Sequence, residues 1–135
     1  MPKQRATPRI VCCAIPIARA AGQLLLVTSR KKPESWVFPK GGFEDSDQKF
    51  EVAAAREALE EAGVRGVVSR YVTTIPTPTA IYHVYEMDVT SLDDQWLEAK
   101  ERRREWVNYA TAMARLQWKP ELAQALSMSS LAPRR

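Results

Sequence analysis

The sequence is poor in the residues that build disulfide scaffolds and histidine-based metal centres. Its 135 residues include only two cysteines and one histidine. The cysteines, Cys12 and Cys13, are adjacent, and adjacent cysteines rarely bond to each other. No disulfide framework is therefore expected, and a reducing compartment is the simpler interpretation. With no second histidine to share a metal ion, we expect His83 to have a structural place in a strand.

Long apolar runs are also missing. No stretch approaches the roughly 20 apolar residues of a membrane-spanning helix, so no membrane partner is expected. The start of the chain is basic in MPKQR, apolar in IVCCAIPIA and then small, which superficially resembles a secretory signal. Because cleavage near Ala20 would remove the apolar segment, we interpret that segment as a buried strand. We expect a cytoplasmic or nuclear protein, with a processed secreted form as the alternative.

No internal repeat, linker or low-complexity segment divides the chain. Its 135 residues are enough for one domain with one core. We expect a single domain over residues 1–135, with the core at about 9–128 and tails at 1–8 and 129–135. The formal net charge of +4 favours an anionic partner without identifying it.

β-branched apolar segments and one long stretch of helical spacing predict the secondary structure. The expected strands are 9–18, 23–29, 36–39, 64–75, 80–89 and 104–109. A helix is expected over 49–62, and Gly63 suits the position just after it. The polar residues 92–103 predict a loop with a short helix, and 110–130 predict two closing helices or one interrupted helix. Strands that enclose one helix and end in helices indicate a mixed α/β sandwich.

The helix expected over 49–62 has two distinct faces. Its apolar stripe is formed by Val52, Ala55, Leu59 and Ala62. Glu57, Glu60 and Glu61 share another face, which we expect to be exposed. Three carboxylates repel one another unless a cation lies there, and carboxylates with a backbone carbonyl suit a hard divalent ion, Mg²⁺ above all. A merely solvated acidic face is the alternative.

The stretch from Gly42 to Val64 resembles the Nudix box, G-x5-E-x7-R-E-U-x-E-E-x-G-U, where U is aliphatic. The matching residues are Gly42, Arg56, Glu57, Glu60, Glu61, Gly63 and Val64. Two positions depart from the pattern: Gln48 replaces the first glutamate, and Ala58 is a small residue at the first aliphatic position. The first glutamate is usually a supporting residue in that family. Its replacement is therefore expected to weaken metal binding or slow catalysis.

The resemblance implies a Nudix-type α/β/α sandwich with a mixed β-sheet, and an enzyme that uses Mg²⁺, with Mn²⁺ as the alternative. Glu57 and Glu61 would be the principal metal ligands, with Glu60 also at the metal site. A backbone carbonyl of Lys40 or Gly41 would add a further ligand.

The implied reaction is attack of water on one phosphorus of a P–O–P bond. Glu60 is the candidate general base, with Glu61 as the alternative, since the division of labour between the two varies within the family. Arg56 would orient the glutamates through charge-assisted hydrogen bonds. Positioning and electrostatic stabilisation would supply most of the catalysis.

A wider resemblance covers most of Arg9 to Leu126. RIVCCA, LLLVTSRKKPESWVFPKGG, IYHVYEM, RRREWVNY and WKPELAQAL are similar to segments of the diphosphoinositol polyphosphate phosphohydrolases, above all fungal members that also act on diadenosine polyphosphates. The implied substrate contacts are Arg9, Ser29, Arg30, Lys31, Arg102 or Arg104, and Lys119. The partner would be a polyphosphorylated small molecule rather than nucleic acid, bound by a monomer. The turn IPTPTAIY lacks the basic residues that hold substrate in animal relatives.

Two other functions stay open. The first keeps the chemistry and changes the substrate to ADP-ribose or a sugar nucleotide, capped RNA or polyphosphate; the basic residues 29–32 argue against weakly charged sugar nucleotides. The second is a Nudix-fold module that binds its ligand without cleaving it, which the intact glutamates argue against. The four tryptophans, Trp36, Trp96, Trp106 and Trp118, are expected to be core or packing residues rather than platforms on which bases stack.

Overall fold

The computed structural model of the chain describes residues 7–133, so most of the predicted tail 1–8 and the last two residues lie outside the described part. The strands are β1 Arg9–Ala18, β2 Gln23–Thr28, β3 Trp36–Val37, β4 Lys40–Gly42, β5 Val64–Pro76, β6 Ala80–Leu92 and β7 Arg104–Asn108. The helices are α1 Phe50–Ala62, α2 Tyr109–Leu116 and α3 Pro120–Ser127, with 3-10 turns η1 Arg19–Ala21 and η2 Asp45–Asp47.

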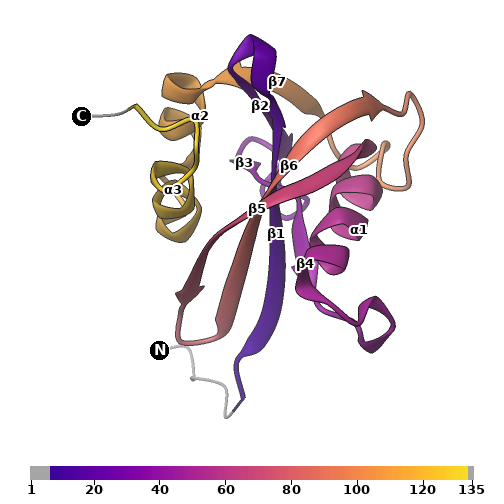
Figure 1. Cartoon of the computed structure of the whole chain (residues 1–135), viewed down its shortest axis with the longest axis vertical. Helices are drawn as coiled ribbons and strands as arrows, with labels where there is room; N and C mark the ends of the chain where they lie inside the picture. The colour runs from indigo at the N-terminus through magenta and orange to yellow at the C-terminus, as the bar shows by residue number, and fades with distance from the viewer. Residues whose placement is uncertain (1–6, 134–135) are drawn as a thin grey trace.

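The strands form one mixed sheet between two helical layers. The main path runs β3-β2-β1-β6-β5, with β4 paired to β1 and β7 paired to β2. Strands β1 and β6 are parallel, and all other pairs are antiparallel. Figure 1 shows α1 on one side of the strands and α2 with α3 on the other. The predicted α/β/α sandwich with a mixed sheet is confirmed.

Strand β1 lies at the centre of this sandwich. Its residues from Val11 to Ile17 are all buried, because helices and neighbouring strands cover both of its faces. This explains why the strand is an unbroken apolar run instead of an alternating one. Interpreting the apolar N-terminal segment as a buried strand is therefore correct.

The packing of α1 differs from the expectation. Of the predicted apolar stripe, Val52 is 46% exposed and only Ala62 is buried. The buried side consists of Ala53, Ala54, Glu57, Ala58, Glu61 and Ala62. Alanines let the helix approach the sheet closely, and this close approach carries two glutamates inward as well. The expectation that the acidic face is exposed is therefore wrong for these two glutamates.

The ends of α1 follow local rules. Gly63 has a φ of 66°, and its N–H reaches the carbonyls of Ala58 and Leu59, as expected of a glycine that ends a helix. The short helix expected within 92–103 does not form: Leu92 ends β6, and residues 93–103 form turns, bends and irregular loop. The closing region contains two separate helices, α2 and α3. None of the helices within residues 7–133 is long and apolar enough to cross a membrane.

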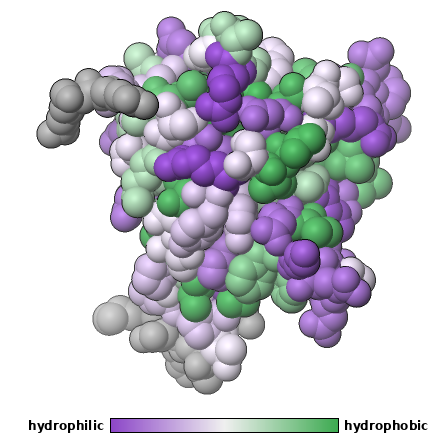
Figure 2. Space-filling view, viewed as in Figure 1, coloured by the Kyte–Doolittle hydropathy of each residue, from purple (hydrophilic) through white to green (hydrophobic). Residues whose placement is uncertain are grey.

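The surface carries scattered apolar side chains. Figure 2 shows them lying among polar ones on the face that it presents. The exposed large apolar residues of the described chain are Val52, Val67, Tyr71, Leu97, Trp118 and Met128. They belong to several different elements, and Trp118 is the one that lines the cavity described next.

Candidate active site

The candidate site begins where α1 presses against β4. A Cβ atom at Gly41 would overlap the carboxylate of Glu57, so only glycine allows this approach. Glu57 is 7% exposed, and burial raises the pKa of its carboxyl group above the ordinary value. The close approach therefore places one carboxylate directly on the backbone of β4.

A second carboxylate lies one helical turn further along. Glu61 accepts a hydrogen bond at 3.1 Å from the backbone N–H of Lys40, and its other oxygen is 3.4 Å from Arg102. Burial raises the pKa of Glu61 to about 7, an effect that Arg102 partly offsets. Burial disfavours the ionised form of both carboxylates, and a cation bound between them would stabilise that form.

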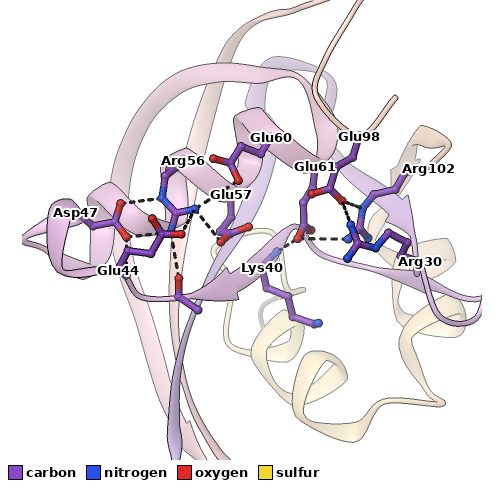
Figure 3. Close-up of polar contacts among 11 residues, drawn as sticks. Arg30, Lys40, Glu44, Asp47, Arg56, Glu57, Glu60, Glu61, Glu98 and Arg102 are labelled. Carbon is purple, nitrogen blue, oxygen red and sulfur yellow. Dashed lines mark hydrogen bonds and ion pairs between the residues drawn. The ribbon is translucent and has the colours of Figure 1, made fainter. Parts of the chain in front are cut away.

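Arg56 joins the acidic side chains in a network that Figure 3 shows in full. Its Nε and one Nη donate to the two oxygens of Asp47 at 2.8 and 2.9 Å. The other Nη donates to Glu57 at 3.0 Å and to Glu60 at 3.4 Å. Within residues 7–133, no three acidic, cysteine or histidine side chains converge on one point. The two arginines lie beside the carboxylates instead.

Asp47 is a site residue that the sequence did not reveal. Its side chain is 3% exposed, and its two hydrogen bonds from Arg56 hold the pKa of its carboxyl group below the ordinary value. The only signal in the sequence was that Asp47 directly precedes Gln48, the residue that replaces the first glutamate of the Nudix box. Spacing alone does not tell which of two consecutive side chains turns inward.

Glu98 was also missed by sequence reasoning, because it lies in the loop between β6 and β7, far from the acidic helix in sequence. Its backbone N–H donates to the carbonyl of Glu60 at 3.1 Å. Its carboxylate accepts a hydrogen bond from Arg102 at 2.8 Å and lies 3.5 Å from Arg30. This loop therefore connects the acidic helix to two cations of the neighbouring cavity.

A cavity of about 510 Å³ opens beside these carboxylates. Its lining residues are Arg9, Val11, Ser29, Arg30, Lys31, Lys32, Val37, Lys40, Gly41, Tyr82, Arg102, Trp118 and Lys119. Seven of these carry a positive charge and none carries a carboxylate. Such a lining attracts a densely charged anion and holds it beside the acidic helix.

The chain matches the profile of the NUDIX domain over residues 7–127.

The chain belongs to the Nudix family.

Curated relatives agree with this assignment. The chain is 35% identical over 115 residues to "Diphosphoinositol polyphosphate phosphohydrolase 3-alpha" of Homo sapiens, covering 81% of this chain and 70% of the relative. It is 34% identical to "Diphosphoinositol polyphosphate phosphohydrolase 2" of Rattus norvegicus, covering 81% and 63%. It is 32% identical to "Nudix hydrolase 21, chloroplastic" of Arabidopsis thaliana, covering 76% and 56%. The chain thus spans less than two thirds of the rat and plant relatives.

Solved structures share the fold. The chain superposes on a "NUDIX hydrolase from Nitrosomonas europaea" with a TM-score of 0.74 and 20% identity, covering 90% of this chain and 87% of the other. Nudix hydrolases generally use divalent metal ions, and the buried Glu57 and Glu61 suit such an ion. The chain is accordingly a Nudix hydrolase.

The cavity brings together most of the residues predicted to bind substrate in this Nudix hydrolase. Arg9, Ser29, Arg30, Lys31, Arg102 and Lys119 all line it, together with Lys40 and Gly41 of the predicted metal site. Arg104 is not among the lining residues. It donates to the carbonyl of Ala62 at 2.8 Å and lies over Trp96 at 4.1 Å, where it supports the end of α1. Of these two alternatives, Arg102 lines the cavity and Arg104 does not, and a substrate contact by Arg102 stays a prediction.

Two aromatic expectations have different outcomes. His83 stacks on Phe50 with ring centroids 4.2 Å apart, which is a packing role as expected. Trp118 is not a core residue: it is 38% exposed and lines the cavity. Its indole N–H donates to the carbonyl of Trp36 at 3.0 Å, and Lys32 lies 5.0 Å from its ring. Trp118 therefore helps to place a cavity cation.

Proposed function

We propose that this Nudix hydrolase is a Mg²⁺-dependent pyrophosphohydrolase of diphosphoinositol polyphosphates and dinucleoside polyphosphates. The observation that carries the proposal is the cavity lined by seven cations and no carboxylate, which opens directly beside the buried glutamates of α1. The named activity of the human and rat relatives supports the same substrate class.

Binding in this proposal depends on charge. A diphosphoinositol polyphosphate carries phosphates in several directions and can engage cations from several elements at once. Arg9 comes from β1, Arg30 and Lys31 from the loop after β2, and Lys119 from the start of α3. A substrate with a single pyrophosphate would leave several of these cations without a partner. The lining therefore favours highly phosphorylated ligands.

Glu57 and Glu61 would hold the metal ion, since both are buried against β4. A bound Mg²⁺ would lower the pKa of the attacking water and neutralise charge on the phosphate oxygens. Glu60 is more accessible than its neighbours, with 33% of its side chain exposed, so a water molecule can reach its carboxylate and transfer a proton to it. Arg56 holds Glu57 and Glu60 in place, and Arg102 holds Glu61.

We further propose that the protein works as a monomer on small molecules, in the cytoplasm or the nucleus. The cavity suits a compact polyanion rather than a nucleic-acid strand, because its cations line a single volume of about 510 Å³. Both cysteines are buried and free, which suits a reducing compartment.

The test is a phosphate-release panel with Mg²⁺ over an inositol pyrophosphate, a diadenosine polyphosphate, ADP-ribose and capped RNA. The expected result is the highest kcat/KM on the first two substrates. A preference for ADP-ribose or capped RNA would overturn the substrate assignment. Tight binding of the inositol pyrophosphate without any release would instead identify a non-catalytic binding module.

A further inference from the structure

The 3-10 turn before α1 holds an unusually well-fixed aspartate. Asp47 accepts hydrogen bonds from Arg56 on both carboxylate oxygens, at 2.8 and 2.9 Å. The backbone N–H of Glu44 donates to the same carboxylate at 2.9 Å. Three short hydrogen bonds from two directions hold the Asp47 carboxylate in a single orientation. The carboxylate in turn holds the Arg56 guanidinium in a single orientation.

The next residue, Gln48, turns the other way. Its φ is 66°, in the left-handed region that non-glycine residues rarely adopt, and its side chain is exposed. A residue in this left-handed conformation makes the chain turn sharply between η2 and α1. As a result, position 47 points into the arginine network and position 48 points into solvent.

We propose that Asp47, and not residue 48, is the positioning carboxylate of this active site. It orients Arg56, and through Arg56 it orients Glu57 and Glu60. The proposal deepens the proposed function, on which its kinetic part rests. It also implies that the departure at Gln48 costs this enzyme little, since the neighbouring aspartate supplies the missing carboxylate.

The charge balance of Arg56 explains why this orientation matters. One side of its guanidinium is occupied by Asp47 and by the carbonyl of Gly42, which accepts at 3.0 Å. Only one nitrogen is left to contact Glu57 and Glu60, and the exposed Glu44 lies 3.5 Å from the same nitrogen. Without the aspartate, a larger share of the Arg56 charge would fall on Glu57 and Glu60, since the remaining acidic partner, Glu44, is exposed and 3.5 Å away. A metal ion would then have to compete with the arginine for the carboxylates.

The first experiment compares three single variants with the wild type. Asp47→Asn keeps the shape of the side chain and removes its negative charge. Asp45→Asn is the matched control, an equal change of charge on an exposed residue of the same turn. Gln48→Glu restores the usual box residue. The readouts are kcat and KM on an inositol pyrophosphate, the thermal midpoint, and Mn²⁺ affinity by electron paramagnetic resonance without substrate.

Of the three variants, only Asp47→Asn is expected to lose activity and metal affinity. Asp47→Asn should lower both kcat and Mn²⁺ affinity by about tenfold or more, as losses of groups that orient metal ligands typically do. KM should change little, because the cavity cations are untouched. Asp45→Asn and Gln48→Glu should remain within about twofold of wild type in both measurements, as expected of exposed positions outside the network.

A double-variant cycle separates positioning from simple stabilisation of the turn. If Asp47 acts through Arg56, then Asp47→Asn should have almost no further effect on Mn²⁺ affinity in an Arg56→Met background. A purely structural aspartate would give the same loss in both backgrounds. Equal losses would therefore overturn the proposal, and the thermal midpoint of each variant shows whether it is folded when measured.

Two other outcomes would also overturn it. One is an Asp47→Asn variant that matches Asp45→Asn in Mn²⁺ affinity and kcat. The other is recovery of the lost Mn²⁺ affinity when Gln48→Glu is added to Asp47→Asn, which would show that position 48 can reach the network. A wild-type protein that releases no phosphate would refute the proposed function instead. The Mn²⁺ comparison would still decide the role of Asp47.

Discussion

At the scale of single residues, each buried glutamate of α1 is paired with its own arginine. Arg56 lies beside Glu57, and Arg102 lies beside Glu61. Arg102 also lines the cavity and donates to the carbonyl of Thr28 at 2.9 Å. The Arg102 side chain therefore lies between the cavity and Glu61, one of the two glutamates that we propose to hold the metal ion.

Gly41 provides the sharpest test of the close approach between α1 and β4. Gly41→Ala should displace the Glu57 carboxylate and lower kcat by about 100-fold, since a shift near one ångström in a catalytic group can cost that much. Gly42→Ala is the matched control, because a Cβ there meets only the end of the Arg9 side chain at 3.5 Å. Steady-state kinetics on both variants is the measurement; similar losses in both would contradict this explanation.

The carboxylates that we propose to be catalytic should be essential for turnover. Glu60→Gln and Glu61→Gln are each expected to lower kcat by about 100-fold or more, as when a general base or metal ligand is lost. Glu101→Gln, a change at an exposed carboxylate of the following loop, serves as the control. Near wild-type phosphate release from both active-site variants would rule out the catalytic assignment.

At the scale of elements, the basic loop after β2 supplies cations to the cavity without belonging to the acidic helix. Arg30 and Lys31 both line the cavity, and the loop is closed by a hydrogen bond from the Ser29 backbone to the carbonyl of Ser35 at 2.8 Å. Its contribution should therefore be to substrate affinity, in proportion to the charge of the substrate.

Replacing Arg30 and Lys31 together by alanine should raise KM mainly for the inositol pyrophosphate. Each exposed cation–phosphate contact contributes about 1 kcal/mol, rising toward about 3 when partly desolvated. The salt dependence of kcat/KM should flatten, while kcat at saturation should fall less. An Arg65→Ala and Lys100→Ala double variant, with both changes outside the cavity lining, controls for net charge. Equal losses on an inositol pyrophosphate and on ADP-ribose would reject a polyphosphate-specific loop.

At the scale of the whole molecule, a buried carboxylate ties the C-terminal segment to the sheet. Glu86 on β6 is fully buried and accepts hydrogen bonds of 2.6 Å from both the backbone N–H and the hydroxyl of Ser130. Arg70 donates to it at 2.5 Å. Burial alone would raise the pKa of Glu86, but these partners outweigh burial and lower it.

This network predicts acid sensitivity. A carboxyl group with a lowered folded-state pKa stabilises the fold above its unfolded pKa, and the stabilisation is lost as pH falls through the folded value. Glu86→Gln should therefore reduce the free energy of unfolding at pH 7 by about 1–3 kcal/mol, with a smaller difference in acid. Glu105→Gln, which alters an exposed pair with Arg115, is the control. Urea unfolding at several pH values is the measurement; a difference that does not change with pH would contradict the linkage.

The sequence by itself determined the family, the acidic helix and most of the cavity. The spacing of Arg56, Glu57, Glu60 and Glu61 places these side chains within reach of one another in any α-helix, since residues three and four apart share a face. Gly63 ends that helix because its backbone conformation is a local property. Local rules act over a few residues and do not depend on the rest of the fold.

Only the tertiary structure decided which side chains turn inward. The small alanines of α1, not its larger apolar residues, meet the sheet, so Glu57 and Glu61 are buried. Asp47 replaces Gln48 in the arginine network because the turn at Gln48 is left-handed. Arg102 reaches the cavity, whereas Arg104, two residues later, supports the end of α1. In each case the outcome depends on contacts between segments far apart in the chain, which no spacing rule contains.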